Sequence, residues 1–188
     1  MRKIVLTFFA ITMLVSCKKE NTSVENKSTS SDSTIVENTL EPENTLFAKI
    51  PEFSVEKVSH LVQPKKNDTL YVTNFFATWC GPCRREMPHF KEKMESMKDQ
   101  PVKFTFVSLD NKTEWETEVK YFGDEYGITS NIVLLDGSLL GPDFFSQNFK
   151  TWDGGSIPFT VFSKNEKSDE FVGMMTKEQL ESKIAALN

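Results

Sequence analysis

The hydrophobic pattern divides the chain into an N-terminal region without a core and a longer region that has one. From residue 18 to about residue 44 the sequence is mostly Ser, Thr, Asn and Glu, with no aromatic residue and no sustained period of 2 or 3.6. Such a segment buries too little apolar surface to offset the entropy of ordering it. We therefore expect a flexible tether over residues 17–45 and a folded domain over residues 46–188.

Apolar runs of two kinds alternate within the expected domain. Short β-branched and aromatic runs predict strands, whereas apolar residues three or four apart predict helices. The expected strands are Leu70–Phe76, Val102–Leu109, Ile132–Leu135, Phe159–Ser163 and Glu170–Gly173, and the expected helices begin near Ser54, Gly81, Thr113, Asp143 and Thr176. Strand and helix alternation that ends in a hairpin and a helix predicts an α/β fold, with a central mixed β-sheet flanked by helices.

Local chemistry fixes two details of this assignment. Thr113 and Glu116 have the spacing of a capping box, so we expect them to open a helix that ends near Phe122. A turn over Lys164–Ser168 is expected between the last two strands. The core is expected to contain a set of aromatic residues, namely Phe104, Phe106, Phe144, Phe145 and Phe149.

Charge and cysteine content narrow the chemistry. The 188 residues carry a formal net charge of −5 and no large basic patch, so we expect no nucleic-acid partner. The three cysteines are Cys17, Cys80 and Cys83. A loop closed across two intervening residues restrains an unfolded chain very little, so the Cys80–Cys83 pair is a poor structural crosslink.

The Cys-x-x-Cys pair lies where an expected strand gives way to an expected helix. Unpaired N–H groups at a helix N-terminus favour a thiolate at Cys80, and Cys83, one turn on, can attack a mixed disulfide formed there. A purely structural disulfide is one alternative. A zinc site is another, but zinc needs four ligands, and only His60 and His89 could supplement the pair. We expect a redox dithiol with no metal and no other cofactor.

The N-terminal residues have the pattern of an export signal. Arg2 and Lys3 precede an apolar run from Ile4 to Val15, and Leu14-Val15-Ser16-Cys17 resembles the lipobox of bacterial lipoproteins. This resemblance implies a signal peptide over residues 1–16 and a lipid on Cys17, which would anchor the protein in a membrane. The alternative is an ordinary secretory signal with a chance cysteine near its end.

The sequence Trp-Cys-Gly-Pro-Cys-Arg-Arg-Glu-Met-Pro, residues 79–88, resembles the TlpA/ResA branch of extracytoplasmic thioredoxin-like proteins. The similarity continues upstream through residues 74–78, and at the level of the fold it covers about residues 46–188. It implies a membrane-anchored thiol–disulfide oxidoreductase that faces the periplasm or the outside. Members reduce disulfides in envelope proteins, such as apo-cytochromes during cytochrome c maturation, and we expect electrons from a membrane-bound donor.

The resemblance also assigns roles to residues around the dithiol. It implies that Glu86, on the helix face of Cys83, tunes the thiols through its charge; the alternative is an ordinary surface glutamate. It places a cis-proline, Pro158, opposite the cysteines, where the Ile157 backbone would pair with a substrate strand. Trp79 is expected to border the dithiol and contact substrate.

Two further features near the dithiol are Asn74 and the loop Trp152–Gly155. Asn74 lies near where cytoplasmic thioredoxins carry a buried Asp, but Asn cannot ionise, and we expect it to bond a neighbouring backbone group. The loop Trp152–Gly155 either contacts substrate or only makes a turn.

The direction of electron flow follows from the Gly-Pro dipeptide between the cysteines. It matches the thioredoxin type, near about −270 mV, rather than strong oxidants near about −120 mV, so we expect a reductant. Two alternatives of other classes are a copper-handling metallochaperone and a non-catalytic binding lipoprotein on the same fold.

Overall fold

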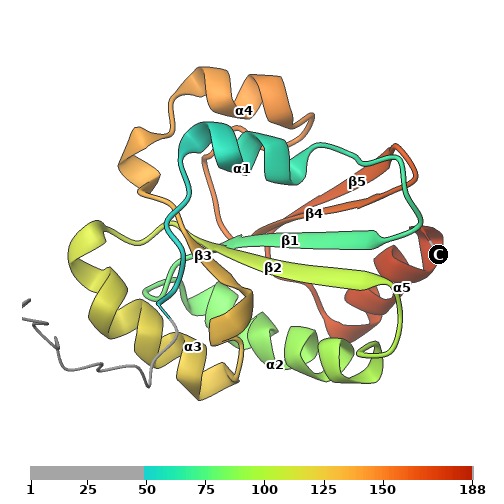
Figure 1. Cartoon of the computed structure of the whole chain (residues 1–188), viewed down its shortest axis with the longest axis horizontal. Coiled ribbons are helices and arrows are strands. Elements are labelled where there is room, and N and C mark those ends of the chain that lie inside the picture. Colours follow the sequence, from blue (N-terminus) through green and yellow to red (C-terminus); the bar gives the residue numbers. More distant parts are fainter. Residues whose placement is uncertain (1–48, 188) are drawn as a thin grey trace, which may run out of the picture. The chain divides into compact units, whose positions relative to one another are not determined.

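The computed structural model describes residues 49–187 and contains five α-helices and five strands in that range (Figure 1). The helices are α1 (Val55–Val62), α2 (Gly81–Ser96), α3 (Lys120–Tyr126), α4 (Pro142–Asn148) and α5 (Lys177–Leu187). The strands are β1 (Leu70–Phe76), β2 (Val102–Ser108), β3 (Ile132–Leu134), β4 (Phe159–Lys164) and β5 (Lys167–Val172). The expected signal peptide, the tether and Cys17 lie outside the described residues.

The strands form one mixed sheet in the order β3-β2-β1-β4-β5. β1 pairs in parallel with β2 and antiparallel with β4, so the strand that leads to the dithiol is the central one. A central strand is covered on both faces, which explains why every residue of β1 except Tyr71 is buried. The predicted α/β class with a central mixed sheet is confirmed.

Alternate side chains of β1 build two separate cores. Leu70, Val72 and Phe76 face the layer that contains α2, α3 and α5, whereas Phe75 faces the layer of α1 and α4 (Figure 1). The Phe76 ring stacks on Phe122 of α3 at 4.8 Å between centroids. These two layers hold β1, and with it the start of α2, from both sides.

The helix expected at Thr113 begins differently. Glu114, not Glu116, caps the segment: its carboxylate accepts a hydrogen bond from the Asn111 backbone N–H at 3.1 Å. A 3-10 turn (Lys112–Glu114) and a π-helical turn (Trp115–Val119) then lead into α3. Glu116 is exposed, because the chain turns so that Trp115 and Val119 are buried. The predicted capping box was therefore wrong.

The turn between the last two strands is shorter than expected. β4 and β5 pair as far as Lys164 and Lys167, so only Asn165 and Glu166 connect them. Both residues have positive φ, 50° and 65°, as two-residue hairpin turns of the primed type require. The two-residue turn was not predicted from the sequence because neither of its residues is glycine, the usual signal for such a conformation.

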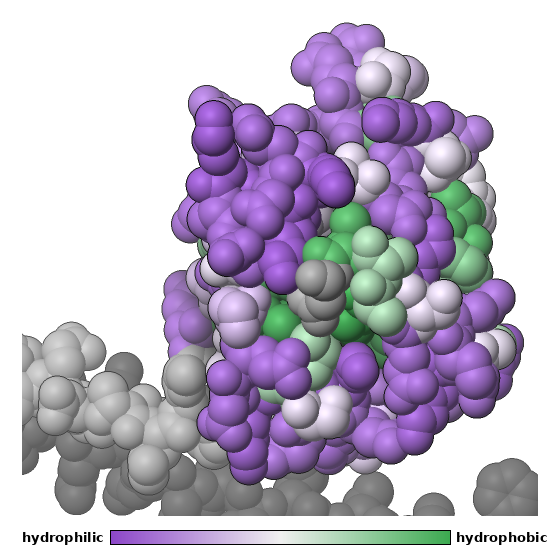
Figure 2. All heavy atoms as spheres, turned by 90° about the vertical axis from the view of Figure 1, so that its right-hand side faces the viewer, coloured by the Kyte–Doolittle hydropathy of each residue, from purple (hydrophilic) through white to green (hydrophobic). Residues whose placement is uncertain are grey.

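Apolar surface is unevenly distributed over the domain. On the side that carries the end of α5, the surface is mainly hydrophilic, with apolar side chains gathered near its centre (Figure 2). The large apolar side chains that are exposed include Trp79 and Leu139. Trp79 directly precedes the dithiol, so one exposed aromatic side chain belongs to the expected site.

Neighbouring residues of α3 offer a matched test of the packing. Phe122 is fully buried and Tyr121 is 67% exposed. We expect Phe122→Ala to lower the free energy of unfolding by about 3–5 kcal/mol, because it removes a large side chain from the core. Tyr121→Ala should change it by less than about 0.5 kcal/mol. Urea unfolding of both variants in the oxidised state measures this, and similar losses in the two would contradict the packing described.

Candidate active site

The dithiol sits at the junction between β1 and α2. Cys80 is the N-cap residue of α2, and its Sγ accepts a hydrogen bond from the Cys83 backbone N–H at 3.2 Å. The two cysteines form a disulfide with an S–S distance of 2.05 Å. Cys80 is 4% exposed and Cys83 is completely buried. An incoming thiol or disulfide therefore reaches Cys80 first.

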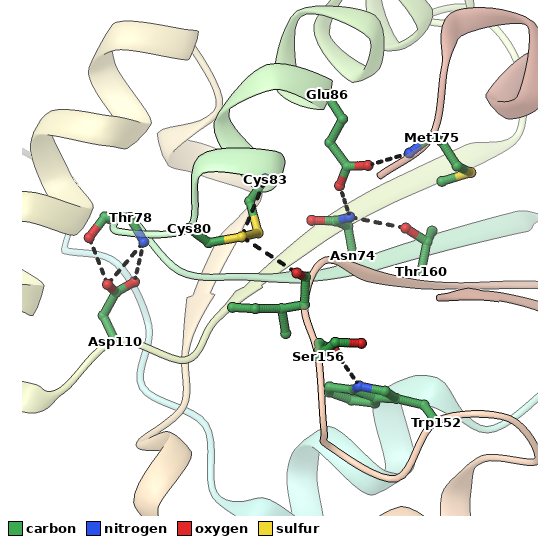
Figure 3. The surroundings of a disulfide bond; sticks show 11 residues. Asn74, Thr78, Cys80, Cys83, Glu86, Asp110, Trp152, Ser156, Thr160 and Met175 are labelled. Carbon is green, nitrogen blue, oxygen red and sulfur yellow. Dashed lines mark hydrogen bonds between the residues drawn. A yellow bond between two sulfur atoms is a disulfide. The ribbon is translucent and has the colours of Figure 1, made fainter. Parts of the chain in front are cut away.

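The segment before β4 faces the dithiol. The Ile157–Pro158 peptide bond is cis, as expected. The Ile157 carbonyl oxygen lies 3.7 Å from Cys80 Sγ (Figure 3). A disulfide sulfur carries no hydrogen, so this contact can become a hydrogen bond only when Cys80 is a thiol.

A hollow of about 630 Å³ opens beside Cys80. Its lining includes Trp79, Pro82, Leu140, Phe145 and Ile157. Trp79 is 67% exposed, a large fraction for so apolar a side chain. Phe145 was expected in the core, but it is only partly buried and forms part of this wall. The hollow is mostly apolar and aromatic, which suits an apolar stretch of polypeptide.

The loop Trp152–Gly155 forms one wall of the hollow. Trp152 is buried, and its Nε1–H donates to the Ser156 carbonyl at 2.7 Å (Figure 3). Gly154 has a φ of +86° and lies so close to Phe145 that a Cβ would overlap the ring. The glycine is thus required both by the turn and by the close approach of the phenylalanine.

Glu86 lies inside the protein, one turn after Cys83. Its Oε1 accepts from Asn74 Nδ2 at 2.8 Å, and its Oε2 accepts from the Met175 backbone N–H at 2.9 Å (Figure 3). Asn74 Nδ2 also donates to the hydroxyl of Thr160 at 3.0 Å. The alternative of a surface glutamate was therefore wrong. So was the backbone partner expected for Asn74, whose hydrogen bonds go to two side chains.

Burial sets the protonation of Glu86. It raises the pKa of Glu86 from 4.5 to about 7, although the hydrogen bonds from Met175 and Asn74 pull it down. The carboxyl group consequently changes charge in the pH range where thiol–disulfide exchange operates. Its tuning role remains a proposal, but the position and the environment that such a role needs are present.

Sequence reasoning missed Asp110, a completely buried carboxylate below the turn that leads to Cys80. It accepts hydrogen bonds from the Thr78 backbone N–H at 3.0 Å and the Thr78 hydroxyl at 2.7 Å (Figure 3). The Ser108 hydroxyl donates to its other oxygen at 2.8 Å. An available signal was that Asp110 follows the strand parallel to β1, so both carboxyl ends meet at one edge of the sheet.

Together these features define a class of protein. A disulfide at the first turn of the helix after the central strand, opposite a cis-proline segment on a mixed sheet, is the arrangement of a thioredoxin-fold thiol–disulfide oxidoreductase.

Comparison with known proteins gives the same result. The family model described as Thioredoxin matches residues 51–126. The chain is 30% identical over 137 residues to the thioredoxin-like protein YneN of Bacillus subtilis (strain 168), which covers 71% of this chain and 75% of that protein. The chain belongs to the thioredoxin family.

The matched relatives include oxidoreductases of the ResA type. The thiol-disulfide oxidoreductase ResA of Geobacillus kaustophilus (strain HTA426) is 32% identical over 116 residues, a match that spans 61% of this chain and 60% of ResA. A crystal structure of a thiol:disulfide interchange protein from Chlorobium tepidum TLS superposes with a TM-score of 0.51 at 22% identity, covering 63% of this chain and 79% of that one. The structural likeness shows the fold, and the chain is a thiol–disulfide oxidoreductase of the thioredoxin family that is similar to ResA.

The buried carboxyl group predicts a specific pH dependence of stability. Folded Glu86 holds its proton up to about pH 7, whereas the unfolded chain releases it near 4.5. The unfolding free energy should therefore fall as the pH rises through this window and level off above it. The contribution is on the order of 3 kcal/mol.

Glu86→Gln should remove this fall, because an amide does not titrate. Urea unfolding of oxidised protein between pH 4 and pH 8 measures the difference from the unmodified chain. Glu95→Gln, an exposed position on the same helix, is the matched control. Parallel pH profiles for the unmodified chain and Glu86→Gln would show that Glu86 is not the responsible group.

Proposed function

We propose that the protein is a membrane-anchored reductase of disulfides in cell-envelope proteins. The observation that carries the proposal is the position of Cys80: a sulfur at the helix N-terminus, beside an open apolar hollow and 3.7 Å from the Ile157 carbonyl. An oxidoreductase that only relayed electrons between small thiols would not need so large a recognition surface.

The reaction is two exchange steps. The Cys80 thiolate attacks one sulfur of a client disulfide, and the other client sulfur leaves as a thiolate. Cys83 then gives up its proton to solvent and its sulfur attacks Cys80 Sγ, which frees the second client sulfur and closes the Cys80–Cys83 disulfide. Two electrons pass to the client, and a membrane-bound donor returns them to the protein.

Client recognition is assigned to the wall around Cys80. An extended client segment would lie against the Ile157 backbone, with apolar side chains in the hollow beside Trp79. Glu86 is assigned the tuning of the thiols: its ionised form disfavours a nearby thiolate, and its protonated form does not.

The reducing direction is supported by the Gly-Pro dipeptide and by the helix position of Cys80. A thiolate stabilised only by one helix N-terminus is a moderate leaving group, which suits a donor of electrons. The clients are envelope proteins, including apo-cytochromes, as the resemblance to the TlpA/ResA branch implies.

The anchoring part of the proposal depends on Cys17 and residues 1–16. None of the helices in residues 49–187 is long and apolar enough to span a membrane. A lipid on Cys17 would hold the domain at the membrane surface, outside the cytoplasm, where disulfides form and persist. No observation within residues 49–187 favours the copper-handling or the non-catalytic alternative.

The division of labour between the cysteines predicts a trapping experiment. Cys83→Ser in the full chain should retain the client in a stable mixed disulfide with Cys80, because no second thiol is present to release it. Non-reducing electrophoresis of cells that express this variant should show envelope proteins linked to it, released by dithiothreitol. Cys80→Ser is the matched control and should link none. Equal adducts in the two variants would contradict the roles.

Lipid anchoring predicts the behaviour of Cys17→Ser. The variant should move from the membrane fraction to the soluble fraction of the envelope and lose the mass of the lipid. Fractionation and mass spectrometry of the expressed chain measure both, with Cys80→Ser as a control that should stay at the membrane. A Cys17→Ser protein that remains acylated and membrane-bound would refute the anchor.

A further inference from the structure

The Asn74 side chain carries an unusual polar atom. Its Oδ1 is buried and has no hydrogen-bond partner, the single such side-chain atom within residues 49–187. Buried polar groups are nearly always paired, because an unmet acceptor loses its water without compensation. An atom of this kind beside a reactive centre calls for a partner that appears in another state of the protein.

The orientation of the amide is fixed by its other end. Nδ2 donates to Glu86 Oε1 at 2.8 Å and to Thr160 Oγ1 at 3.0 Å, which uses both of its hydrogens. Thr160 lies directly opposite Asn74 in the β1–β4 pair, so the sheet itself holds the amide. Because the amide is planar, Oδ1 points away from both partners, toward the disulfide (Figure 3).

Cys83 is the cysteine that this oxygen can meet. Cys83 is completely buried and lies one turn before Glu86, to which Asn74 is bonded. Cys80 Sγ is engaged elsewhere: it accepts from the Cys83 backbone N–H and lies against the Ile157 carbonyl. The first turn of α2 therefore presents Cys83 to the sheet and Cys80 to the hollow.

We propose that Asn74 Oδ1 accepts a hydrogen bond from the Cys83 thiol when the disulfide is reduced, and so keeps Cys83 protonated while Cys80 carries the negative charge. A partner dithiol supplies two electrons and two protons and becomes a disulfide; the Cys80–Cys83 bond breaks, Cys83 Sγ receives one of the protons, and the other passes to solvent, which leaves Cys80 as a thiolate. The thiol can then donate to the oxygen that has no partner in the oxidised form.

The consequence is that the two thiols differ in how readily they ionise, although the groups that cause the difference are neutral. A hydrogen bond to the protonated form of a group favours that form, so Asn74 disfavours ionisation of Cys83 without carrying a charge itself. The helix N-terminus favours ionisation of Cys80 at the same time. The inference rests on the roles proposed above for the two cysteines, and Asn74 acts on the second of them.

Infrared spectroscopy of the S–H stretch tests the proposal directly. Cys83 is isolated by subtracting the spectrum of the full chain with Cys80→Ser and Cys83→Ser from that of the chain with Cys80→Ser alone. A thiol that donates a hydrogen bond absorbs at lower wavenumber than a free thiol. Adding Asn74→Leu should move the band to higher wavenumber, whereas Asn74→Asp, which keeps an oxygen there, should not.

Thr160→Val is the matched control. It removes one of the two acceptors of Asn74 Nδ2, while the bond to Glu86 Oε1 still holds the amide with Oδ1 in place, so the Cys83 band should keep its position. A band that is unmoved by Asn74→Leu, or moved equally by Thr160→Val, overturns the proposal.

A second measurement needs no variant. In protein labelled with carbon-13 at asparagine side chains, the Asn74 carbonyl resonance should shift when the intact disulfide is reduced. The Asn131 carbonyl, which accepts from Ser130, should not shift. An Asn74 resonance that is the same in both redox states overturns the proposal. Neither measurement involves a client, so its outcome is independent of whether the protein reduces envelope disulfides.

Discussion

The first turn of α2 is capped by a sulfur atom, and the chemistry of the protein depends on that cap. Most helices begin with an oxygen from Ser, Thr, Asp or Asn, which satisfies an N–H group of the first turn. Here Cys80 Sγ fills that position and accepts from the Cys83 N–H at 3.2 Å. The partial positive charge of the helix N-terminus, which would otherwise stabilise a capping oxygen, here stabilises a thiolate. The contact between Cys80 Sγ and the Cys83 N–H therefore both caps the helix and favours the reactive thiolate. Asp110 holds the preceding turn in place through its hydrogen bonds with Thr78.

A second constraint lies beneath the dithiol, where four segments meet at one buried polar network. Asn74 of β1 joins Glu86 of α2 to Thr160 of β4, and Glu86 also accepts from the Met175 N–H before α5. Such a network is costly unless its members are paired, and it fixes the positions of the elements that it joins. The one oxygen that it leaves unpaired points toward the cysteines. Through the hydrogen bond proposed above, the network would link the redox state of the dithiol to the interior of the sheet.

The sequence was sufficient for features that depend on neighbouring residues. The strand before Cys80, the helix after it, and the proline at the start of β4 all follow from local patterns. Contacts between residues far apart in the chain could not be predicted from the sequence. Asn74 and Glu86 are 12 residues apart, and Thr78 and Asp110 are 32 apart. Both contacts depend on strand register and on which face of α2 turns inward. A capping motif offers competing positions within a few residues, and burial of Trp115 selected Glu114 over Glu116.

A reducing protein outside the cytoplasm must hold its dithiol at a potential below that of its clients. The equilibrium potential of the Cys80–Cys83 couple is therefore the most direct measurement of the central claim. It can be determined by equilibrating the full chain with dithiothreitol buffers and quantifying the thiols that react. A value near about −270 mV, the thioredoxin level, is predicted. A value above about −180 mV would identify an oxidant or isomerase and contradict the account.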